Sequence, residues 1–312
     1  MTLRLVQYVD EDDWPSTGLL ADGEIYDLDD ALTGAGFDLM ETVFMDDVMD
    51  ILSDREMVAM ARDALESIDG EVPVEGARLL PPVYPPKLFC LATNFMSHMQ
   101  ESISQSLQGG RQTRELDTPR VFMKPSQNTV IGGGEPLMLS KTAQFVDYEA
   151  EMAIIIGDPA KELSVEQAGD HIAGVTIIND ISERELHIWD REEERDWDNF
   201  FDWLNGKWYD GFAPMGPCVV PVEDVGDPDD LDIILRLNGE VMQEANTSEM
   251  IFNCAEIVSY ISHICTLVPG DVIACGTPAG VGKHRGIRLK DGDLMEVEIP
   301  EIGVLRTPVV GP

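Results

Sequence analysis

Alternating acidic residues precede a hydrophobic run near the middle of the chain. Glu149 and Glu151 stand two apart in the stretch that leads into residues 152–156, and Asp180 follows the apolar residues 173–179. Because the side chains of a strand alternate between its faces, the two glutamates share one face and lie close enough to bind one cation. Oxygen ligands suit Mg²⁺, Mn²⁺ or Ca²⁺ better than zinc. These acids are also explained as the solvated face of an edge strand, with Asp180 as a turn residue.

A histidine and a glutamate form a second pair with chemical potential. His98 and Glu101 are three residues apart, so on a helix they share one face, and the carboxylate can orient the imidazole as a general base. The alternative is an ordinary surface pair. Asn94, just before this segment, is predicted either to bind substrate or to cap the helix.

Basic residues are scarce, so those in apolar or glycine-rich surroundings are informative. Lys207 lies between a glycine and a tryptophan, which favours a cation held near a developing oxyanion. Lys124 ends a predicted strand and either contacts substrate or pairs with one of many acids. Arg184 either binds a carboxylate in bidentate fashion or pairs with a neighbouring glutamate.

A glycine-rich loop at residues 276–282 follows another apolar strand. Its backbone amides and the Thr277 hydroxyl are suited to holding a substrate carboxylate, which makes Gly276 and Thr277 candidate binding residues. The loop lacks the Gly-Lys-Ser/Thr ending of a phosphate-binding loop. A plain glycine-proline turn is the alternative.

Short strands must position most of these side chains. Residues 3–30 alternate like a small sheet with a turn at Asp22-Gly23, residues 44–68 have helical apolar spacing, and the proline-rich residues 80–86 suggest a linker. We therefore predict a small N-terminal α/β domain at 1–80 and a catalytic domain at 81–312. The expected strands there are 88–92, 121–124, 149–156, 175–179, 231–237, 272–275 and 294–299.

Helices and turns complete the predicted catalytic domain. Helices are expected at 97–107 and 165–172, and Asn238-Gly239 is a strong hairpin signal. Residues 246–249 are expected to cap a helix that runs to about Cys265. The charged segment 190–202, with embedded aromatic residues, is typical of an ordered surface insertion. The predicted fold class is α+β, predominantly β.

The composition restricts the partners. The chain has 312 residues, 44% of them hydrophobic, and 59 acidic against 21 basic residues, a formal net charge of −38. This charge opposes nucleic acid binding, and the apolar content indicates a folded chain with an acidic surface, which we interpret as adaptation to high salt. No apolar run is long enough to span a membrane and no signal segment is apparent, so a cytoplasmic protein is expected. The five cysteines are predicted to be buried free thiols.

Short motifs in a fixed order resemble the fumarylacetoacetate hydrolase family over roughly residues 84–312. They are residues 87–101, Phe-Met-Lys-Pro at 122–125, Asp-Tyr-Glu-Ala-Glu at 147–151, Asn-Asp-Ile-Ser-Glu-Arg at 179–184, Gly-Lys at 206–207, Pro-Met-Gly-Pro at 214–217, Asn-Gly-Glu at 238–240, Pro-Gly-Asp at 269–271 and Gly-Thr-Pro-Ala-Gly-Val-Gly at 276–282. The resemblance implies a β-sandwich roll, a homodimer, and Mg²⁺ or Mn²⁺ on Glu149, Glu151 and Asp180, with Ca²⁺ as an alternative occupant in crystals. It also implies that His98 and Glu101 activate water on a segment that closes over substrate.

The sequence departs from this family in two places. His187 stands where members commonly carry a glutamine that touches substrate, and the segment 190–202 differs from their shorter loop. His187 is therefore a candidate substrate-binding residue, and the substrate is left open.

The predicted activity is metal-dependent hydrolysis of a carbon–carbon bond in a small 1,3-diketo or 2-oxo acid. A lyase or isomerase on the same scaffold is the alternative: a decarboxylase of oxo-tricarboxylates or oxaloacetate, a tautomerase of 2-hydroxy-dienoates, or a dehydratase of 2-keto-3-deoxy sugar acids. A non-enzymatic acidic ion-binding protein is the third hypothesis.

Overall fold

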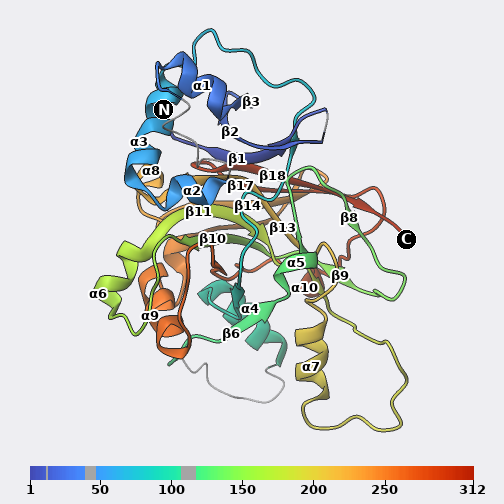
Figure 1. Ribbon diagram of the computed structural model, residues 1–312. Coiled ribbons are helices and arrows are strands. Elements are labelled where there is room, and N and C mark those ends of the chain that lie inside the picture. The colour runs from blue at the N-terminus through green and yellow to red at the C-terminus, as the bar shows by residue number, and fades with distance from the viewer. Residues whose placement is uncertain (12, 39–46, 107–116) are drawn as a thin grey trace.

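Strands form the larger part of the architecture (Figure 1). The computed structural model describes residues 1–11, 13–38, 47–106 and 117–312, and the largest sheet within them has 11 strands. In hydrogen-bonded order they are β3 (Glu24–Asp27), β2 (Pro15–Ala21), β1 (Leu5–Val9), β13 (Ala213–Pro221), β11 (Ile172–Asn179), β10 (Ala150–Ile156), β16 (Val272–Ala274), β5 (Leu88–Leu91) and β6 (Val121–Lys124), with β4 (Arg78–Leu79) beside β1 and β7 (Val130–Ile131) beside β13.

A smaller sheet packs against this one. Its order is β15 (Glu240–Asn246), β14 (Asp232–Leu237), β17 (Leu294–Ile299), β18 (Gly303–Val310) and β8 (Leu137–Met138), while β12 (Ser182–Glu183) pairs with β9 (Val146–Asp147). The predicted class, α+β with strands predominant, is confirmed.

The helices are short. They are α1 (Leu28–Gly34), α2 (Val48–Leu52), α3 (Arg55–Glu66), α4 (Met96–Ser106), α5 (Ser126–Thr129), α6 (Val165–Ala168), α7 (Asp198–Asn205), α8 (Val222–Val225), α9 (Cys254–Ile264) and α10 (Gly282–Arg285), with 3₁₀ turns η2 (Gly169–His171) and η3 (Thr247–Glu249). Among the described residues, no helix combines the length and the apolar character that a membrane crossing needs.

Strand β10 is buried on both faces. Met152, Ile154 and Ile156 point into a core shared with α9 and the smaller sheet, whereas Ala153 and Ile155 point into a second core shared with α2 and α3. Figure 1 shows these two layers, with α1 to α3 on one side of β10 and β11 and α9 on the other. A strand covered on both sides explains the continuous apolar run 152–156.

The N-terminal strands extend the large sheet. β1 pairs with β13 through Leu5 and Val219, and β2 and β3 continue outward from β1. The predicted turn at Asp22-Gly23 joins β2 to β3, and both residues have positive φ, as the hairpin requires. The division at residues 80 and 81 stays a prediction.

The helical spacing expected over residues 44–68 is confirmed by α2 and α3, which are two separate helices because Asp54 caps the second; residues 44–46 lie outside the described residues. Two other local predictions need correction. Residues 246–249 are not the start of the helix that ends near Cys265. Asn246 caps the 3₁₀ turn η3, and Asn253 caps α9. The end of the segment 165–172 is the 3₁₀ turn η2, and Ile172 already begins β11.

Asn94 ties together three segments beside the large sheet. Its Nδ2 donates to the carbonyl oxygens of Phe252 (3.0 Å) and Cys275 (2.8 Å), and its Oδ1 accepts from the Phe252 amide (3.0 Å). A Cβ on Gly276, whose φ is +100°, would lie 2.8 Å from Asn94 Cβ. Glycine at position 276 is therefore required both by the backbone conformation and by the close approach of Asn94.

Replacing Asn94 should destabilise the fold. Asn94→Ala leaves buried groups of Phe252 and Cys275 without partners, so we expect the free energy of unfolding to fall by about 3 kcal/mol. Urea denaturation followed by circular dichroism measures this change. The exposed Asn199→Ala is the matched control and should shift the midpoint little. Equal midpoints for the two variants would contradict the structural role of Asn94.

Candidate active site

Three buried carboxylates meet at the ends of β10 and β11. Glu149, Glu151 and Asp180 are at most 6% exposed, and one oxygen from each lies within 4.8 Å of the others. Glu151 pairs with Ile178 across the two strands, and the Asp180 amide donates to the Glu149 carbonyl oxygen (2.8 Å). The strand alternation therefore places all three acids on one face, and the solvated edge-strand alternative is wrong because they are buried.

Two lysines contact these acids. Lys207 Nζ donates to Glu149 Oε2 (3.0 Å), Asp180 Oδ2 (2.6 Å) and Ser182 Oγ (2.9 Å). Lys124 Nζ donates to Asp180 Oδ1 (2.5 Å) and to two backbone carbonyl oxygens. Burial lowers the pKa of Lys124, whereas Asp180 and Glu149 outweigh burial and raise the pKa of Lys207. Lys207 is thus firmly held as a cation.

Arg184 joins the carboxylate cluster to the loop at residues 282–283. Its Nε donates to Asp147 Oδ2 (2.9 Å), and its Nη2 donates to Glu149 Oε1. Asp147 also accepts from the amides of Gly282 (2.6 Å) and Lys283 (3.0 Å). The partners of Arg184 are therefore Asp147 and Glu149, rather than the adjacent glutamates considered from the sequence.

Glu151 differs from its neighbours because it has no basic partner. Its Oε2 accepts from the Gly276 amide (2.7 Å), but its Oε1 is buried without a hydrogen-bond partner among the described residues. Burial raises the pKa of Glu151 well above its usual range, and Asp180 and Glu149 raise it further. Burial acts on Glu149 too, but Arg184 and Lys207 hold its pKa well below the usual range. A divalent cation fits this site because it would neutralise Glu151 and coordinate its free oxygen.

His98 and Glu101 lie on α4, opposite the carboxylates. His98 Nδ1 is 3.7 Å from Glu101 Oε2, which accepts from the Gly280 amide (3.1 Å). Burial tends to raise the pKa of Glu101, but His98 and the Gly280 amide outweigh it and lower that pKa. His284, from α10, lies next to His98 with ring centroids 6.1 Å apart. No sequence spacing connects these two histidines.

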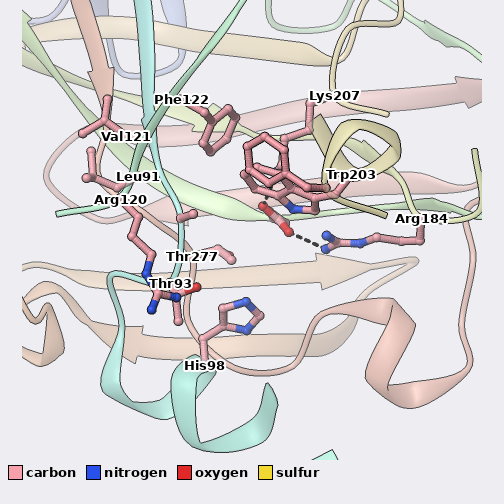
Figure 2. A pocket seen from close by; sticks show the side chains of 13 residues that line it. Leu91, Thr93, His98, Arg120, Val121, Phe122, Arg184, Trp203, Lys207 and Thr277 are labelled. Carbon is pink, nitrogen blue, oxygen red and sulfur yellow. Dashed lines mark hydrogen bonds and ion pairs between the residues drawn. The ribbon is translucent and has the colours of Figure 1, made fainter. Parts of the chain in front are cut away.

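A cavity of about 440 Å³ opens between α4 and the carboxylates (Figure 2). Its charged and polar lining includes His98, Glu149, Arg184, Lys207 and Thr277, which the sequence had singled out. It is also lined by residues that the sequence reasoning missed: Leu91, Ala92, Thr93, Arg120, Val121, Phe122, Phe200 and Trp203. Of these, Thr93 carried no sequence signal, although its φ of +62° is uncommon for a β-branched residue and typical of functional sites.

The remaining predicted residues lie around this cavity or apart from it. The Thr277 hydroxyl accepts from Gln243 Nε2 (2.8 Å), and Gly276 contacts Glu151 through its amide. Asn94 is committed to Phe252 and Cys275, as described above. His187 is exposed, lies 3.0 Å from Asp190 and lines a neighbouring surface hollow. The substrate contacts proposed for these residues stay predictions.

Fold and site together define a class of enzyme: a mostly β catalytic unit with a buried carboxylate cluster and a histidine–glutamate pair across a small cavity. The family model described as fumarylacetoacetate (FAA) hydrolase C-terminal matches residues 87–310. The chain therefore belongs to the fumarylacetoacetate hydrolase family, and the hypothesis of a non-enzymatic ion-binding protein is set aside.

Individual relatives agree with this assignment. The mitochondrial oxaloacetate tautomerase of Xenopus laevis is 33% identical over 253 residues, which cover 80% of this chain and 74% of that protein. The solved fumarylacetoacetate hydrolase of Exiguobacterium antarcticum is 28% identical with a TM-score of 0.75, covering 100% of both chains. The maleylpyruvate hydrolase of Sphingobium is 26% identical with a TM-score of 0.72, covering 99% of this chain and 100% of that chain.

Neutralising the two glutamates should have opposite effects on the metal-free protein. Glu151→Gln removes a buried carboxyl group that has no basic partner and whose ionisation opposes folding, so we expect stabilisation by about 1–3 kcal/mol at pH 7. Glu149→Gln leaves Arg184 and Lys207 short of a partner and should destabilise by about 3 kcal/mol. Thermal unfolding in EDTA measures both, with the exposed Glu244→Gln as control.

The stability difference between Glu151→Gln and the wild type should depend on pH. Folded Glu151 keeps its proton to a higher pH than unfolded Glu151, so its ionisation reduces stability as the pH rises above about 4.3, the ordinary glutamate value. The advantage of Glu151→Gln should therefore disappear near pH 4. Mg²⁺ should raise the unfolding temperature of the wild type but not that of Glu151→Gln. A destabilised metal-free Glu151→Gln would contradict this charge assignment.

Proposed function

We propose that this chain is a divalent-metal-dependent enzyme that transfers a proton at the carbon next to the carbonyl of a small 2-oxo acid, interconverting its keto and enol forms. The observation that carries the proposal is the buried cluster of Glu149, Glu151 and Asp180, which faces His98 across a cavity of small-molecule size. The similarity to oxaloacetate tautomerase makes oxaloacetate the first substrate to test.

The divalent ion, proposed to be Mg²⁺ or Mn²⁺ on Glu149, Glu151 and Asp180, would act as a Lewis acid toward a 2-oxo carboxylate. Lys207, fixed by Glu149 and Asp180, places a permanent positive charge beside the carbonyl oxygen as negative charge develops there. His98 accepts the proton from carbon or returns it, while Glu101 orients the imidazole.

Aromatic rings restrict water around Lys207. Its Nζ lies 4.9 Å from the ring centroid of Phe122 and 5.7 Å from that of Trp203. Figure 2 shows these rings on the side of the cavity where Lys207 lies. A low local dielectric strengthens the interaction between the ammonium group and a developing oxyanion. The cavity wall thus favours reactions that pass through an enolate.

Hydrolysis of a carbon–carbon bond, which was the first prediction from the sequence, is the second candidate. It is favoured by the position of Glu101, which can orient His98 to activate water as well as to move a proton at carbon. The solved maleylpyruvate hydrolase supports the same possibility on this scaffold. Both reactions share the enolate, and hydrolysis additionally requires that water reach the carbonyl carbon.

We further propose a cytoplasmic homodimer adapted to high salt. The five cysteines are free, four of them buried and Cys265 half-buried, which suits a reducing compartment. The exposed aromatic residues Trp189, Trp197, Phe200 and Phe201 support a surface that another subunit covers. The formal net charge of −38 supports solubility in concentrated salt.

The discriminating experiment follows the enol absorbance of oxaloacetate and acetylpyruvate with Mg²⁺, together with product analysis. A tautomerase accelerates the approach of oxaloacetate to its keto–enol equilibrium without net loss of material. A hydrolase instead releases pyruvate and acetate from acetylpyruvate. If neither substrate responds with Mg²⁺ or Mn²⁺, the proposal for this substrate class fails.

His98 is expected to be required for turnover. His98→Gln removes the proton-transferring group without altering the carboxylate cluster, so kcat should fall at least about 100-fold while KM changes little. Steady-state kinetics with the best substrate of the panel tests this. His171→Gln, at a half-buried histidine in η2, serves as the control. A His98→Gln enzyme with wild-type kcat would exclude His98 as the acid–base group.

A further inference from the structure

A second group of metal-ligating side chains lies beside the carboxylate cluster and shares no residue with it. His98 and Glu101 come from α4 and His284 comes from α10. One ligand atom from each of the three side chains lies within 4.8 Å of the others. The two elements are far apart in sequence, so the fold itself brings these ligands together.

Two of these side chains have unsatisfied buried nitrogens. Nδ1 of His98 and Nδ1 of His284 are buried without hydrogen-bond partners within the part of the chain that the structure describes. Such atoms reduce stability unless a ligand satisfies them. The two imidazoles meet edge to face, with an interplanar angle of 81°. This arrangement leaves room for one ligand between them, which face-to-face stacking would not.

One pair of candidate ligand atoms has nearly the spacing of a tetrahedral metal site. Bonds of about 2.0–2.1 Å to nitrogen and oxygen place tetrahedral ligand atoms roughly 3.4 Å apart. His98 Nδ1 and Glu101 Oε2 are already 3.7 Å apart. All three candidate ligand atoms lie within 4.8 Å of one another, so the side chains of this cluster need to approach by about 1.4 Å at most to reach that spacing.

The ligand chemistry differs from that of the carboxylate cluster. Two imidazoles and one carboxylate are the ligand set of many zinc sites, whereas three carboxylates suit harder ions such as Mg²⁺. Lys283 and Arg285 flank His284 and oppose cation binding, but Arg285 is directed to the Met242 carbonyl oxygen (2.7 Å) and Lys283 is exposed. The Glu101 carboxylate offsets part of this positive charge.

We propose that His98, Glu101 and His284 form a second metal site, selective for Zn²⁺ and similar transition-metal ions over Mg²⁺. Occupation of this site joins α4 to α10 and takes the imidazole of His98 away from proton transfer. Zn²⁺ bound there therefore inhibits the enzyme while the carboxylate cluster stays available to Mg²⁺. The binding of the ion goes beyond the proposed function because it requires no turnover, whereas the inhibition rests on the role proposed there for His98.

The test uses Co²⁺ as a coloured substitute for Zn²⁺ on the full-length protein in excess Mg²⁺. The wild type should bind one Co²⁺ per chain with the intense visible absorption of a four-coordinate ion, and Zn²⁺ should displace it. His284→Asn and His98→Asn should each weaken this binding by about 100-fold or more. Thermal unfolding of each variant checks that it is folded.

Two controls separate the sites. His171→Asn changes a histidine outside the cluster and should keep the wild-type spectrum, and Glu151→Gln should keep it while losing the Mg²⁺-dependent rise in unfolding temperature. A spectrum that persists in His284→Asn, or that excess Mg²⁺ removes from the wild type, overturns the second site. Because the spectrum needs no substrate, that result is distinguishable from a failed activity assay.

Discussion

The candidate active site has more buried carboxylates than basic side chains to neutralise them. Among the described residues around the cavity, the carboxylates of Asp147, Glu149, Glu151 and Asp180 are opposed by Lys124, Lys207 and Arg184. Each of these basic side chains donates hydrogen bonds to particular carboxylates, and none of them donates to Glu151. A buried carboxylate in that position is costly unless it holds a proton or a cation. The arrangement of the cluster therefore suits a proton or a divalent ion at Glu151.

The sheet makes this arrangement possible. β10 and β11 are covered on both faces, so their ends are fixed by the packing of two cores, and the acids continue the face that carries Ala153 and Ile155. A loop could not hold like charges this close without moving them apart. The turn after α7 presents Lys207 to the cavity and the glycine-rich loop after β16 presents Thr277, whereas His98 comes from α4.

The sequence predicted the features that depend on local periodicity. The alternation of Glu149 and Glu151 placed the two glutamates on one face, but Asp180 was equally explained as a turn residue, and the three acids were assigned to one ion through the resemblance to the family. Strand β13 was missed because Pro214, Gly216 and Pro217 weaken any strand signal, although β11 and β1 supply its neighbours. β18 was missed as well.

Features that depend on distant segments were beyond reach of the sequence. His284 meets His98 only through the fold, and the aromatic residues of α7 approach the cavity only because that helix packs beside β6, as the contact between Phe122 and Trp203 shows. Capping residues were ambiguous for a different reason. Asn246 and Asn253 both begin capping boxes, and the choice of which starts the longer helix depends on the tertiary structure.

Arg184 connects the carboxylate cluster to the loop before His284. One guanidinium group holds both Glu149 and Asp147, and Asp147 in turn holds the backbone of the loop that leads into His284. A ligand that draws Glu149 away from Arg184 leaves Asp147 as the remaining acidic partner of this guanidinium group. Asp147 also accepts from the amides of Gly282 and Lys283, so a continuous path of hydrogen bonds runs from the carboxylates to the start of α10. A single side chain therefore spans the two ends of the cavity.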